Sequence, residues 1–185
     1  MCDALIFYRP LAEKKSGVLN KLSLTKEEYY LLTLHRAGNV DSPDILRRIF
    51  KALSSLAVPV VFPAHPRTKK MLRRGRIKPA QNIRVIDPVG YLEMICLEMN
   101  AGKILTDSGG VQKEAYILGI PCVTLRDETE WVETVEAGWN ILVGTDRKKI
   151  LAAANNFNPT SPRPPLFGDG TASQHNSRAI GSIEF

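Results

Sequence analysis

The chain has 185 residues, of which 44% are hydrophobic and 24% charged, and its formal net charge is +6 at pH 7. These values are typical of a globular protein with one sizeable core. No apolar run approaches the ~20 residues that span a membrane, and the first residues lack the pattern of a secretory signal. The three cysteines cannot all pair and show no metal-ligand spacing, so we expect reduced thiols, a cytoplasmic location and no membrane partner.

Residues 1–22 are predicted to form a helix that is interrupted at Pro10. The helical pattern begins without an N-cap, as a cut inside a longer protein would, so we interpret residues 1–22 as a linker helix from a preceding part of that protein. Residues 23–157 form the predicted main domain, and residues 158–185 form a C-terminal extension that packs outside the main sheet. The extension begins with four prolines between residues 158 and 165, and a polar segment follows from 171 to 180.

Six segments of the main domain are predicted to be β-strands, because each is a short run of apolar, branched or aromatic residues. In chain order they are residues 29–34, 58–62, 83–86, 103–105, 122–125 and 141–143. Helical patterns separate them; one begins at Asp41-Ser42-Pro43, and another has Asp146 as its N-cap. Several strands are continuously apolar, as in a parallel sheet that is covered on both faces. We therefore predict the α/β class with a Rossmann-like, doubly wound parallel sheet.

The stretch from Thr106 to Glu114 is predicted to contain a strand end, a tight turn and the start of a helix. This geometry offers free backbone N–H groups and the positive end of a helix dipole to an anion. Ser108 can add a hydroxyl group, and Gly109 and Gly110 let a phosphate approach the backbone. The plain alternative is an ordinary strand–turn–helix corner in which Ser108 is only a cap.

Other polar groups follow neighbouring strands, and right-handed crossovers place all these loops at one edge of the sheet. His35 and Arg36 begin a predicted polar loop, residues 35–39, where the pair can hold a diphosphate and His35 can transfer a proton. His65 lies between two prolines, where either a ligand or a turn accounts for a polar residue. Glu128 and Glu130 could form a carboxylate pair for acid–base catalysis, but orienting a loop or binding sugar hydroxyls fits them better. The histidines lack metal-ligand spacing, so we expect no metal site.

Basic residues concentrate between positions 67 and 78. They are Arg67, Lys69, Lys70, Arg73, Arg74, Arg76 and Lys78. A nucleic-acid surface is one interpretation of such a run. Because the run contains no aromatic residue for base stacking, we favour a solvated helix face or a general attraction for a phosphorylated ligand, and we expect no nucleic-acid partner.

Five motifs occur in order: LHRAGNV at 34–40, PAHP at 63–66, DPVGY at 87–91, TDSGGVQKEA at 106–115 and LRDETE at 125–130. Together they resemble the C-terminal half of the non-hydrolysing UDP-N-acetylglucosamine 2-epimerases, and the resemblance covers Met1 to about Ile180. The resemblance implies that this chain is one of two Rossmann-like domains. In the family the two domains face each other across a cleft, which is the glycosyltransferase-B arrangement. Such enzymes interconvert UDP-GlcNAc and UDP-ManNAc, for surface polysaccharides, by eliminating and re-adding UDP, and no cofactor is implied.

The resemblance also implies roles for residues at the matching motif positions. His35 would contact the diphosphate and assist the departure and return of UDP, and His65 would line the same pocket. Glu114 would bind the ribose hydroxyls. The phosphates would be cradled by Ser108, Gly109 and Gly110. The remaining residues placed around the substrate are Arg36, Tyr91, Arg126 and Glu130.

Two positions depart from the family's pattern: Gly38 stands where a glutamate is common, and Trp131 where many members have an arginine. A modified UDP-sugar, oxidised or diacetamido, is therefore an alternative substrate.

The resemblance implies that the carboxylates that move the C2 proton belong to an absent N-terminal half. That half is an implied partner, and homodimer formation is also implied. We predict an exposed apolar strip where that half would sit. An alternative from another class of protein is that the chain is the UDP-sugar-binding half of a split glycosyltransferase.

Overall fold

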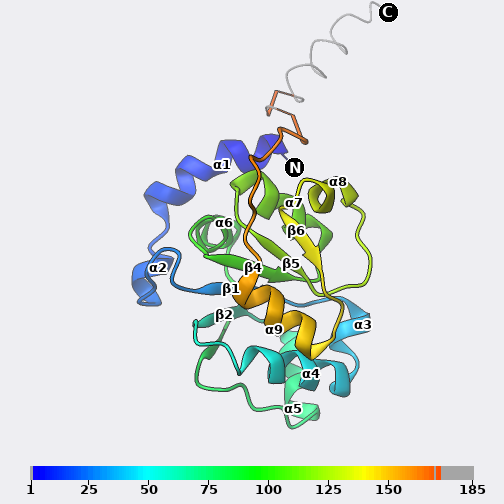
Figure 1. The fold of residues 1–185 in the computed structure, drawn as a ribbon. Coiled ribbons are helices and arrows are strands. Elements are labelled where there is room, and N and C mark those ends of the chain that lie inside the picture. The colour runs from blue at the N-terminus through cyan, green and yellow to red at the C-terminus, as the bar shows by residue number, and fades with distance from the viewer. Residues whose placement is uncertain (1, 169, 172–185) are drawn as a thin grey trace, which may run out of the picture.

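A computed structural model describes residues 2–168, 170 and 171 of the chain. Its six strands form one parallel sheet in the order β3-β2-β1-β4-β5-β6 (Figure 1). The strands are β1 Tyr30–Thr33, β2 Val60–Pro63, β3 Ile83–Ile86, β4 Lys103–Thr106, β5 Cys122–Thr124 and β6 Asn140–Leu142. Each strand begins and ends within two residues of its predicted bounds, which confirms the α/β class and the doubly wound sheet.

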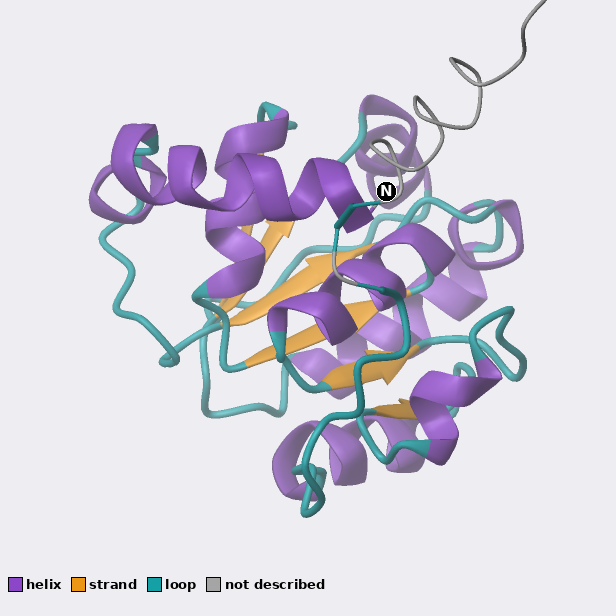
Figure 2. Cartoon of the chain, turned by 90° about the horizontal axis from the view of Figure 1, so that it is seen from above, coloured by secondary structure: helices purple, strands orange, loops and turns teal. Residues whose placement is uncertain are grey.

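Helices cover both faces of the sheet, as Figures 1 and 2 show. One face carries α4 (Pro43–Leu53), α5 (Pro66–Arg74) and α9 (Arg147–Asn156). The other face carries α1 (Cys2–Lys15), α2 (Val18–Lys21), α6 (Tyr91–Met99) and α7 (Gly109–Leu118). Two short helices, α3 (Ala37–Val40) and α8 (Val132–Glu136), follow the ends of strands. Across the part of the chain that the structure describes, no helix combines the length and the apolar character needed to cross a membrane.

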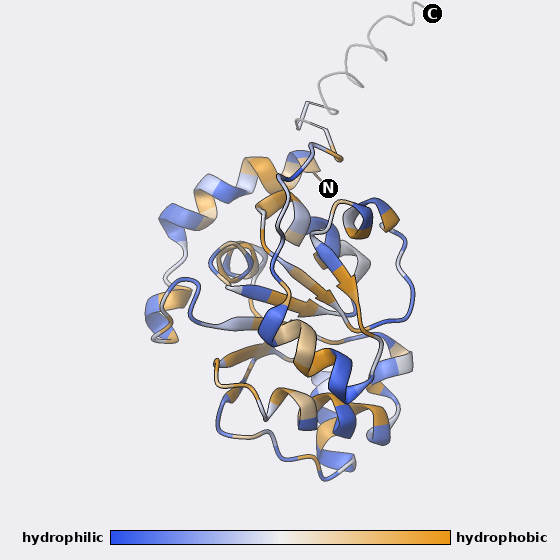
Figure 3. Ribbon diagram, in the orientation of Figure 1, coloured by the Kyte–Doolittle hydropathy of each residue, from blue (hydrophilic) through white to orange (hydrophobic). Residues whose placement is uncertain are grey.

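Two hydrophobic cores lie on either side of the sheet, because successive residues of a strand point to opposite faces. Leu32 and Leu105 enter the core with α4 and α9, whereas Leu31 and Ile104 enter the core with α1 and α6. All four side chains are fully buried. Figure 3 shows hydrophobic residues along the strands, with hydrophilic ones on the outer sides of the helices. Burial from both faces is the reason that these strands are continuous apolar runs.

The strand order reverses between β1 and β4, in the middle of the sheet. These two strands pair from Tyr30 with Lys103 to Thr33 with Thr106, so they end at the same level. The long helices that follow them, α4 and α7, lie on opposite faces of the sheet. In α/β sheets, ligands bind outside the carboxyl ends of the strands at such a reversal. The topology therefore directs attention to the loops after β1 and β4.

Two local predictions are wrong. The first helix is not interrupted at Pro10 but continues through it to Lys15. Proline removes one backbone hydrogen bond, but Leu5 and Ala12, on either side of it, are fully buried in the core shared with α6 and hold the helix together. The predicted polar loop at residues 35–39 contains the one-turn helix α3, which local sequence does not favour and tertiary hydrogen bonds stabilise.

The described part of the C-terminal extension packs against α7. Arg163 Nη1 donates to the carbonyl oxygens of Tyr116 at 2.7 Å and Ile117 at 2.9 Å. The Tyr116 hydroxyl donates to Pro164 O at 2.6 Å, and the Phe167 ring lies edge-on to Tyr116 with centroids 5.4 Å apart. In Figure 1 the orange segment after α9 accordingly runs past α7 towards α1. Apart from its first residue, the predicted polar segment 171–180 lies outside the described residues, and the domain boundaries stay a prediction.

Replacing Gly102 with Ala is expected to destabilise the sheet. A Cβ at Gly102 would lie 2.5 Å from the backbone oxygen of Glu27, and Gly102 N–H already donates to Tyr29 O at 2.9 Å. Relief of the clash requires the backbone to shift, so we expect the free energy of unfolding to fall by about 1–3 kcal/mol in urea denaturation. The matched control is Gly38→Ala in α3, because no described atom lies within 4 Å of a Cβ there. Equal unfolding midpoints for the two variants would contradict this expectation.

Candidate functional site

The carboxylate of Asp107 joins the loops that follow β1, β4 and β5. It is fully buried and accepts hydrogen bonds from the backbone N–H groups of His35 and Arg36, each at 3.1 Å. The side-chain amide of Asn39 donates to the same carboxylate at 3.2 Å and to Leu125 O at 2.9 Å. These bonds hold α3 in place. They also fix the loop after β1 against the turn after β4, at the point where the strand order reverses.

The first turn of α7 follows Asp107 directly. Ser108 is its N-cap, and the Ser108 hydroxyl accepts a hydrogen bond from Val111 N–H at 3.4 Å. None of the described residues accepts the N–H groups of Gly109 and Gly110. The predicted strand, turn and helix start are therefore confirmed. Free N–H groups and the positive end of a helix dipole favour an anion at this turn.

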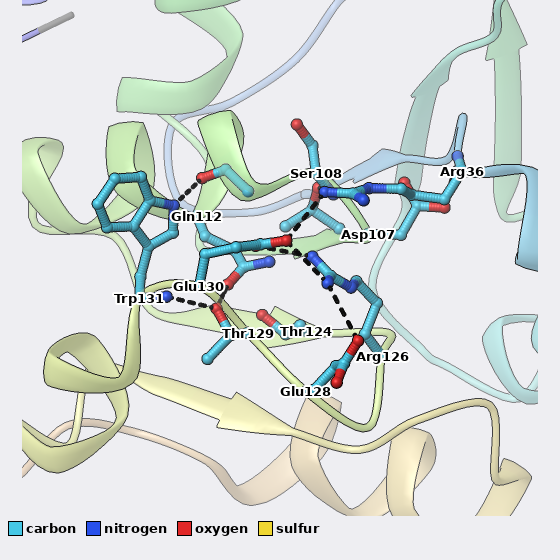
Figure 4. Close-up of polar contacts among 12 residues, drawn as sticks. Arg36, Asp107, Ser108, Gln112, Thr124, Arg126, Glu128, Thr129, Glu130 and Trp131 are labelled. Carbon is cyan, nitrogen blue, oxygen red and sulfur yellow. Dashed lines mark hydrogen bonds and ion pairs between the residues drawn. The ribbon is translucent and has the colours of Figure 1, made fainter.

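Two arginines converge on one carboxylate beside this turn (Figure 4). Arg126 donates from Nη1 and Nη2 to the two oxygens of Glu130, both at 2.9 Å, and Arg36 Nη2 donates to Glu130 Oε1 at 3.2 Å. Glu130 Oε2 would lie 2.9 Å from a Cβ at Gly109, so the carboxylate sits directly against the turn. The hydrogen bonds from Arg126 are the main reason that the pKa of Glu130 is lowered to about 2. Glu128 lies 4.0 Å from Arg126 Nη2, so the two guanidinium groups face two carboxylates here.

The residues on either side of Glu130 are attached to α7. Trp131 Nε1 donates to Gly109 O at 2.8 Å, and Trp131 backbone N–H donates to Thr129 Oγ1 at 3.0 Å. The Thr129 hydroxyl in turn donates at 2.5 Å to Oε1 of Gln112, which is fully buried in α7. Figure 4 shows these bonds beside the arginine pair. The loop after β5 is therefore positioned by the helix that carries the glycine turn.

His35 and His65 line one hollow of about 220 Å³ at the carboxyl ends of β1 and β2. The His35 side chain is half exposed, and its Nδ1 lies 3.5 Å from Asp107 Oδ1. His65 is the N-cap of α5, and its Nδ1 accepts a hydrogen bond from Arg67 N–H at 3.2 Å. The structural role predicted as an alternative for His65 is thus present, and the side chain also borders the hollow.

Tyr91, Glu98 and Glu114 form a second polar group, where α6 packs on α7. The Tyr91 hydroxyl donates to Glu114 Oε1 at 3.5 Å. Glu98 is buried, and among the described residues neither of its carboxylate oxygens has a hydrogen-bond partner. Burial and then the charge of Glu114 raise the pKa of Glu98 well above its usual value, and burial raises the pKa of Glu114. Burial and these two carboxylates also raise the pKa of Tyr91 to about 12. Burial is the first cause of all three shifts, so this environment favours the uncharged forms of these groups.

The structure arranges the predicted site residues in three groups. Around the first turn of α7 lie Arg36, Ser108, Gly109, Gly110, Arg126 and Glu130; beside the hollow lie His35 and His65; between α6 and α7 lie Tyr91 and Glu114. Sequence reasoning did not single out Asp107 or Glu98. A signal existed for both, because Asp107 directly follows a buried strand and Glu98 interrupts the apolar residues of a core helix.

The predicted basic run lies on and after α5. Arg67 pairs with Asp41, and Lys69 donates to Asp87 at 2.5 Å, so part of its charge is neutralised by the chain itself. Among residues 2–168, 170 and 171, no group of three or more metal-ligating side chains is present. The site offers positive groups, hydroxyl groups and titratable histidines, a combination suited to holding an anionic ligand and moving a proton near it.

Comparison with known proteins identifies a family. Residues 1–181 match the model of the UDP-N-acetylglucosamine 2-epimerase family. A Methanococcus maripaludis protein named UDP-N-acetylglucosamine 2-epimerase homolog is 51% identical over 179 residues, covering 94% of this chain and 50% of that protein. The UDP-2,3-diacetamido-2,3-dideoxy-D-glucuronate 2-epimerase of Pseudomonas aeruginosa is 44% identical over 188 residues, covering 99% of this chain and 51% of that protein. The chain thus spans about half the length of these curated relatives.

Solved structures are similar over the same half. The UDP-GlcNAc 2-epimerase of Methanocaldococcus jannaschii, determined in complex with UDP-GlcNAc and UDP, has a TM-score of 0.86 and 41% identity, covering 98% of this chain and 53% of that chain. The Neisseria meningitidis UDP-GlcNAc 2-epimerase, bound to UDP-GlcNAc, has a TM-score of 0.79 at 27% identity, covering 98% of this chain and 53% of that chain.

Replacing Asp107 with Asn is expected to loosen the site. The substitution replaces one acceptor oxygen with an NH₂ group. That group is a donor and cannot accept a hydrogen bond from the N–H group of His35 or Arg36. Hydrogen bonds to a charged acceptor contribute about 1.5–3 kcal/mol each, so we expect the free energy of unfolding in urea to fall by about 2 kcal/mol or more. Asp44→Asn is the control, because Asp44 is an exposed residue of α4 whose pair with Arg47 contributes little, within about 0.5 kcal/mol. An unchanged midpoint for D107N would show that Asp107 does not organise the loops.

Replacing Glu98 with Gln is expected to change how stability depends on pH. The ordinary pKa of a glutamate is 4.5, and burial in the folded chain raises the pKa of Glu98 well above it. Folding therefore favours the protonated form of Glu98. The wild type therefore loses stability as the pH rises from about that value through the raised pKa, by about 1–3 kcal/mol for an uncompensated buried group. E98Q cannot ionise and should lack this loss, so its advantage in melting temperature should be larger at pH 8.5 than at pH 5. The control Glu13→Gln, an exposed residue of α1, should follow the wild type, and parallel curves for E98Q would contradict the prediction.

Proposed function

Because the chain belongs to the UDP-N-acetylglucosamine 2-epimerase family, we propose that it is the UDP-binding C-terminal domain of an enzyme that interconverts UDP-GlcNAc and UDP-ManNAc. The observation that carries the proposal is the anion site at the first turn of α7. Free N–H groups of Gly109 and Gly110 lie there beside two arginines, at the reversal of the strand order. A diphosphate supplies the charge and the acceptor oxygens that these groups bind.

The proposed nucleotide contacts extend from this turn in two directions. The Ser108 hydroxyl and the two glycine N–H groups hold the phosphates, with Arg36 and Arg126 facing them. Glu114, on the same helix, binds the ribose hydroxyls, and Tyr91, which donates a hydrogen bond to it, orients that carboxylate. His35 follows β1 and contacts the diphosphate, and His65 borders the same hollow.

The proposed chemistry is the departure and return of UDP. Negative charge grows on the leaving phosphate oxygen as the bond to the sugar breaks, and preorganised N–H and guanidinium groups stabilise it. His35 can give a proton to this oxygen and take it back on return. Glu130 is a poor base for the C2 proton at neutral pH, because its pKa is about 2 and two arginines hold it. We therefore assign the proton transfer at C2 to the absent N-terminal half.

The sugar is proposed from the named relatives. Relatives named as UDP-N-acetylglucosamine 2-epimerases support UDP-GlcNAc, for example one from Methanocaldococcus jannaschii that is 46% identical over 162 residues. The Pseudomonas aeruginosa relative acts, by its name, on a diacetamido sugar, which keeps a modified UDP-sugar as the second candidate. The epimerase names of these relatives favour this reaction over the split glycosyltransferase.

The proposed partner is the N-terminal half of the enzyme. Large apolar side chains are exposed on α1, namely Ile6, Phe7 and Tyr8, and the Tyr8 ring lies 5.8 Å from that of exposed Tyr91. This surface fits the predicted apolar strip, and we propose that the N-terminal half covers it. A homodimer of the full enzyme and a cytoplasmic location, in which the three free cysteines stay reduced, complete the proposal.

Calorimetric titration of the chain with UDP, UDP-GlcNAc and uridine tests the proposal. We expect similar affinity for UDP and UDP-GlcNAc and weaker binding of uridine, because the phosphates carry the main interactions. NMR of UDP-GlcNAc incubated with the chain alone should show no UDP-ManNAc. If neither UDP nor UDP-GlcNAc binds, the proposal is overturned. If the chain alone converts UDP-GlcNAc, the assignment of proton transfer to the absent half is overturned.

The Ser108→Ala variant separates ligand binding from stability. Ser42 caps α4 as Ser108 caps α7, with its hydroxyl accepting from Ile45 N–H at the same distance, 3.4 Å. Both alanine variants should lose about 1 kcal/mol of stability as caps. Only S108A should also bind UDP about three- to tenfold more weakly, through the lost hydroxyl. Equal UDP affinity of the two variants would contradict a phosphate contact from Ser108.

A further inference from the structure

Trp131 connects the glycine turn to the C-terminal extension. On one side its indole N–H donates to Gly109 O at 2.8 Å. On the other side its ring lies edge-on to Phe167 with centroids 5.5 Å apart. The ammonium group of Lys113, in α7, lies 4.5 Å from the centroid of each ring. A residue of the extension thus packs on the side chain that holds the first residue of α7.

The bond from Trp131 adds to the helix rather than replacing part of it. A carbonyl oxygen has two lone pairs, and within α7 the Gly109 oxygen also faces the N–H group one turn later. The indole therefore fixes the orientation of the Gly109 peptide group without competing with the helix. That orientation sets the direction of the Gly110 N–H group, because the two belong to the same rigid peptide plane.

Trp131 also bears on the arginine pair. Glu130 lies between Thr129 and Trp131, and both neighbours are bonded to α7, at Gln112 and Gly109. The Glu130 carboxylate is consequently held against the turn, where it receives Arg36 and Arg126. A shift of Trp131 would move the backbone of Glu130 and change the spacing between the guanidinium groups and the free N–H groups.

We propose that Trp131 is a positioning residue of the diphosphate site, and that Phe167 supports it from the C-terminal extension. The inference rests on the proposed function, because it names the residues that align the phosphate-binding groups for UDP. Trp131 does not touch the ligand; it holds Gly109 and Glu130 in register. The extension thereby becomes part of the site, although none of its described residues supplies a charged group at the glycine turn.

The chain contains two tryptophans, which provides a matched control. Trp139 Nε1 donates to Ser161 O at 3.2 Å. Trp139 directly precedes β6 and so lies at the amino ends of the strands, whereas the site lies at their carboxyl ends. Both Trp131→Phe and Trp139→Phe remove one indole N–H bond to a backbone oxygen and keep an aromatic ring. Because Ser161 belongs to the C-terminal extension, a loosened extension affects the two variants alike, whereas only W131F loses the bond to Gly109.

The first readout is the affinity of UDP relative to uridine, measured by calorimetry. W131F should bind UDP about three- to tenfold more weakly, as expected for one neutral hydrogen bond, with uridine affinity unchanged. F167L should show a smaller loss of the same kind, and W139F should match the wild type in both affinities. In W139F the remaining tryptophan is Trp131, so its fluorescence should change on titration with UDP and stay constant with uridine.

The second readout requires no ligand. Amide hydrogen exchange across the first turn of α7, at Gln112 and Lys113, should be faster in W131F than in W139F and the wild type. If the wild type does not bind UDP but W131F shows this faster exchange, the proposed function fails and the positioning role stands. If UDP binds and W131F alters neither the UDP-to-uridine affinity ratio nor the exchange, the positioning role is overturned.

Discussion

The buried carboxylate of Asp107 is the constraint on which the site depends. Parallel strands bring the loops after β1, β4 and β5 to one edge, but nothing in a sheet ladder fixes those loops relative to one another. Asp107 accepts the N–H groups of His35 and Arg36, and Asn39 extends the same network to the loop after β5. These donors would otherwise be buried or half-buried without partners, at a cost of several kcal/mol in total. One charged side chain therefore converts three independent loops into a single structure.

The charges around the glycine turn are balanced before any ligand arrives. Arg36 and Arg126 would repel each other at close range, and Glu130 compensates by accepting from both. Thr129 and Trp131 hold that carboxylate through α7, so the arginines are oriented by neighbours and not by the ligand. Such preorganisation is how binding sites avoid ordering long side chains at the moment of binding. The arrangement also explains why the loop after β5, distant in sequence, belongs to the site.

Glu98 breaks a rule that nearly all the buried side chains of the described residues obey, the other exception being Gln112 Nε2. Buried carboxyl groups normally have hydrogen-bond partners, and within the described residues Glu98 has none. Its neighbour Glu114 is the proposed ribose ligand, so the unfavourable burial lies next to a proposed binding residue. Violations of this kind are expected at functional positions, where stability is given up for a specific protonation state.

The sequence by itself determined the six strands, most of the helices and the topology class, but not the course of α1 through Pro10 or the short helix α3. Continuous apolar runs indicated strands buried on both faces, and the cap residues Ser108 and Asp146 marked helix starts, because these signals depend on nearby residues alone. The ordered motifs indicated the family, and the edge of the sheet at which polar residues gather followed from the handedness of the crossovers. Only the tertiary structure decided that Asp107 organises that edge, that Glu130 joins two arginines, and that Trp131 contacts both Gly109 and Phe167. Apart from the Arg126–Glu130 pair, which is four positions apart, those contacts link residues from 22 to 94 positions apart, and side-chain geometry across such separations arises from packing, which local sequence does not encode.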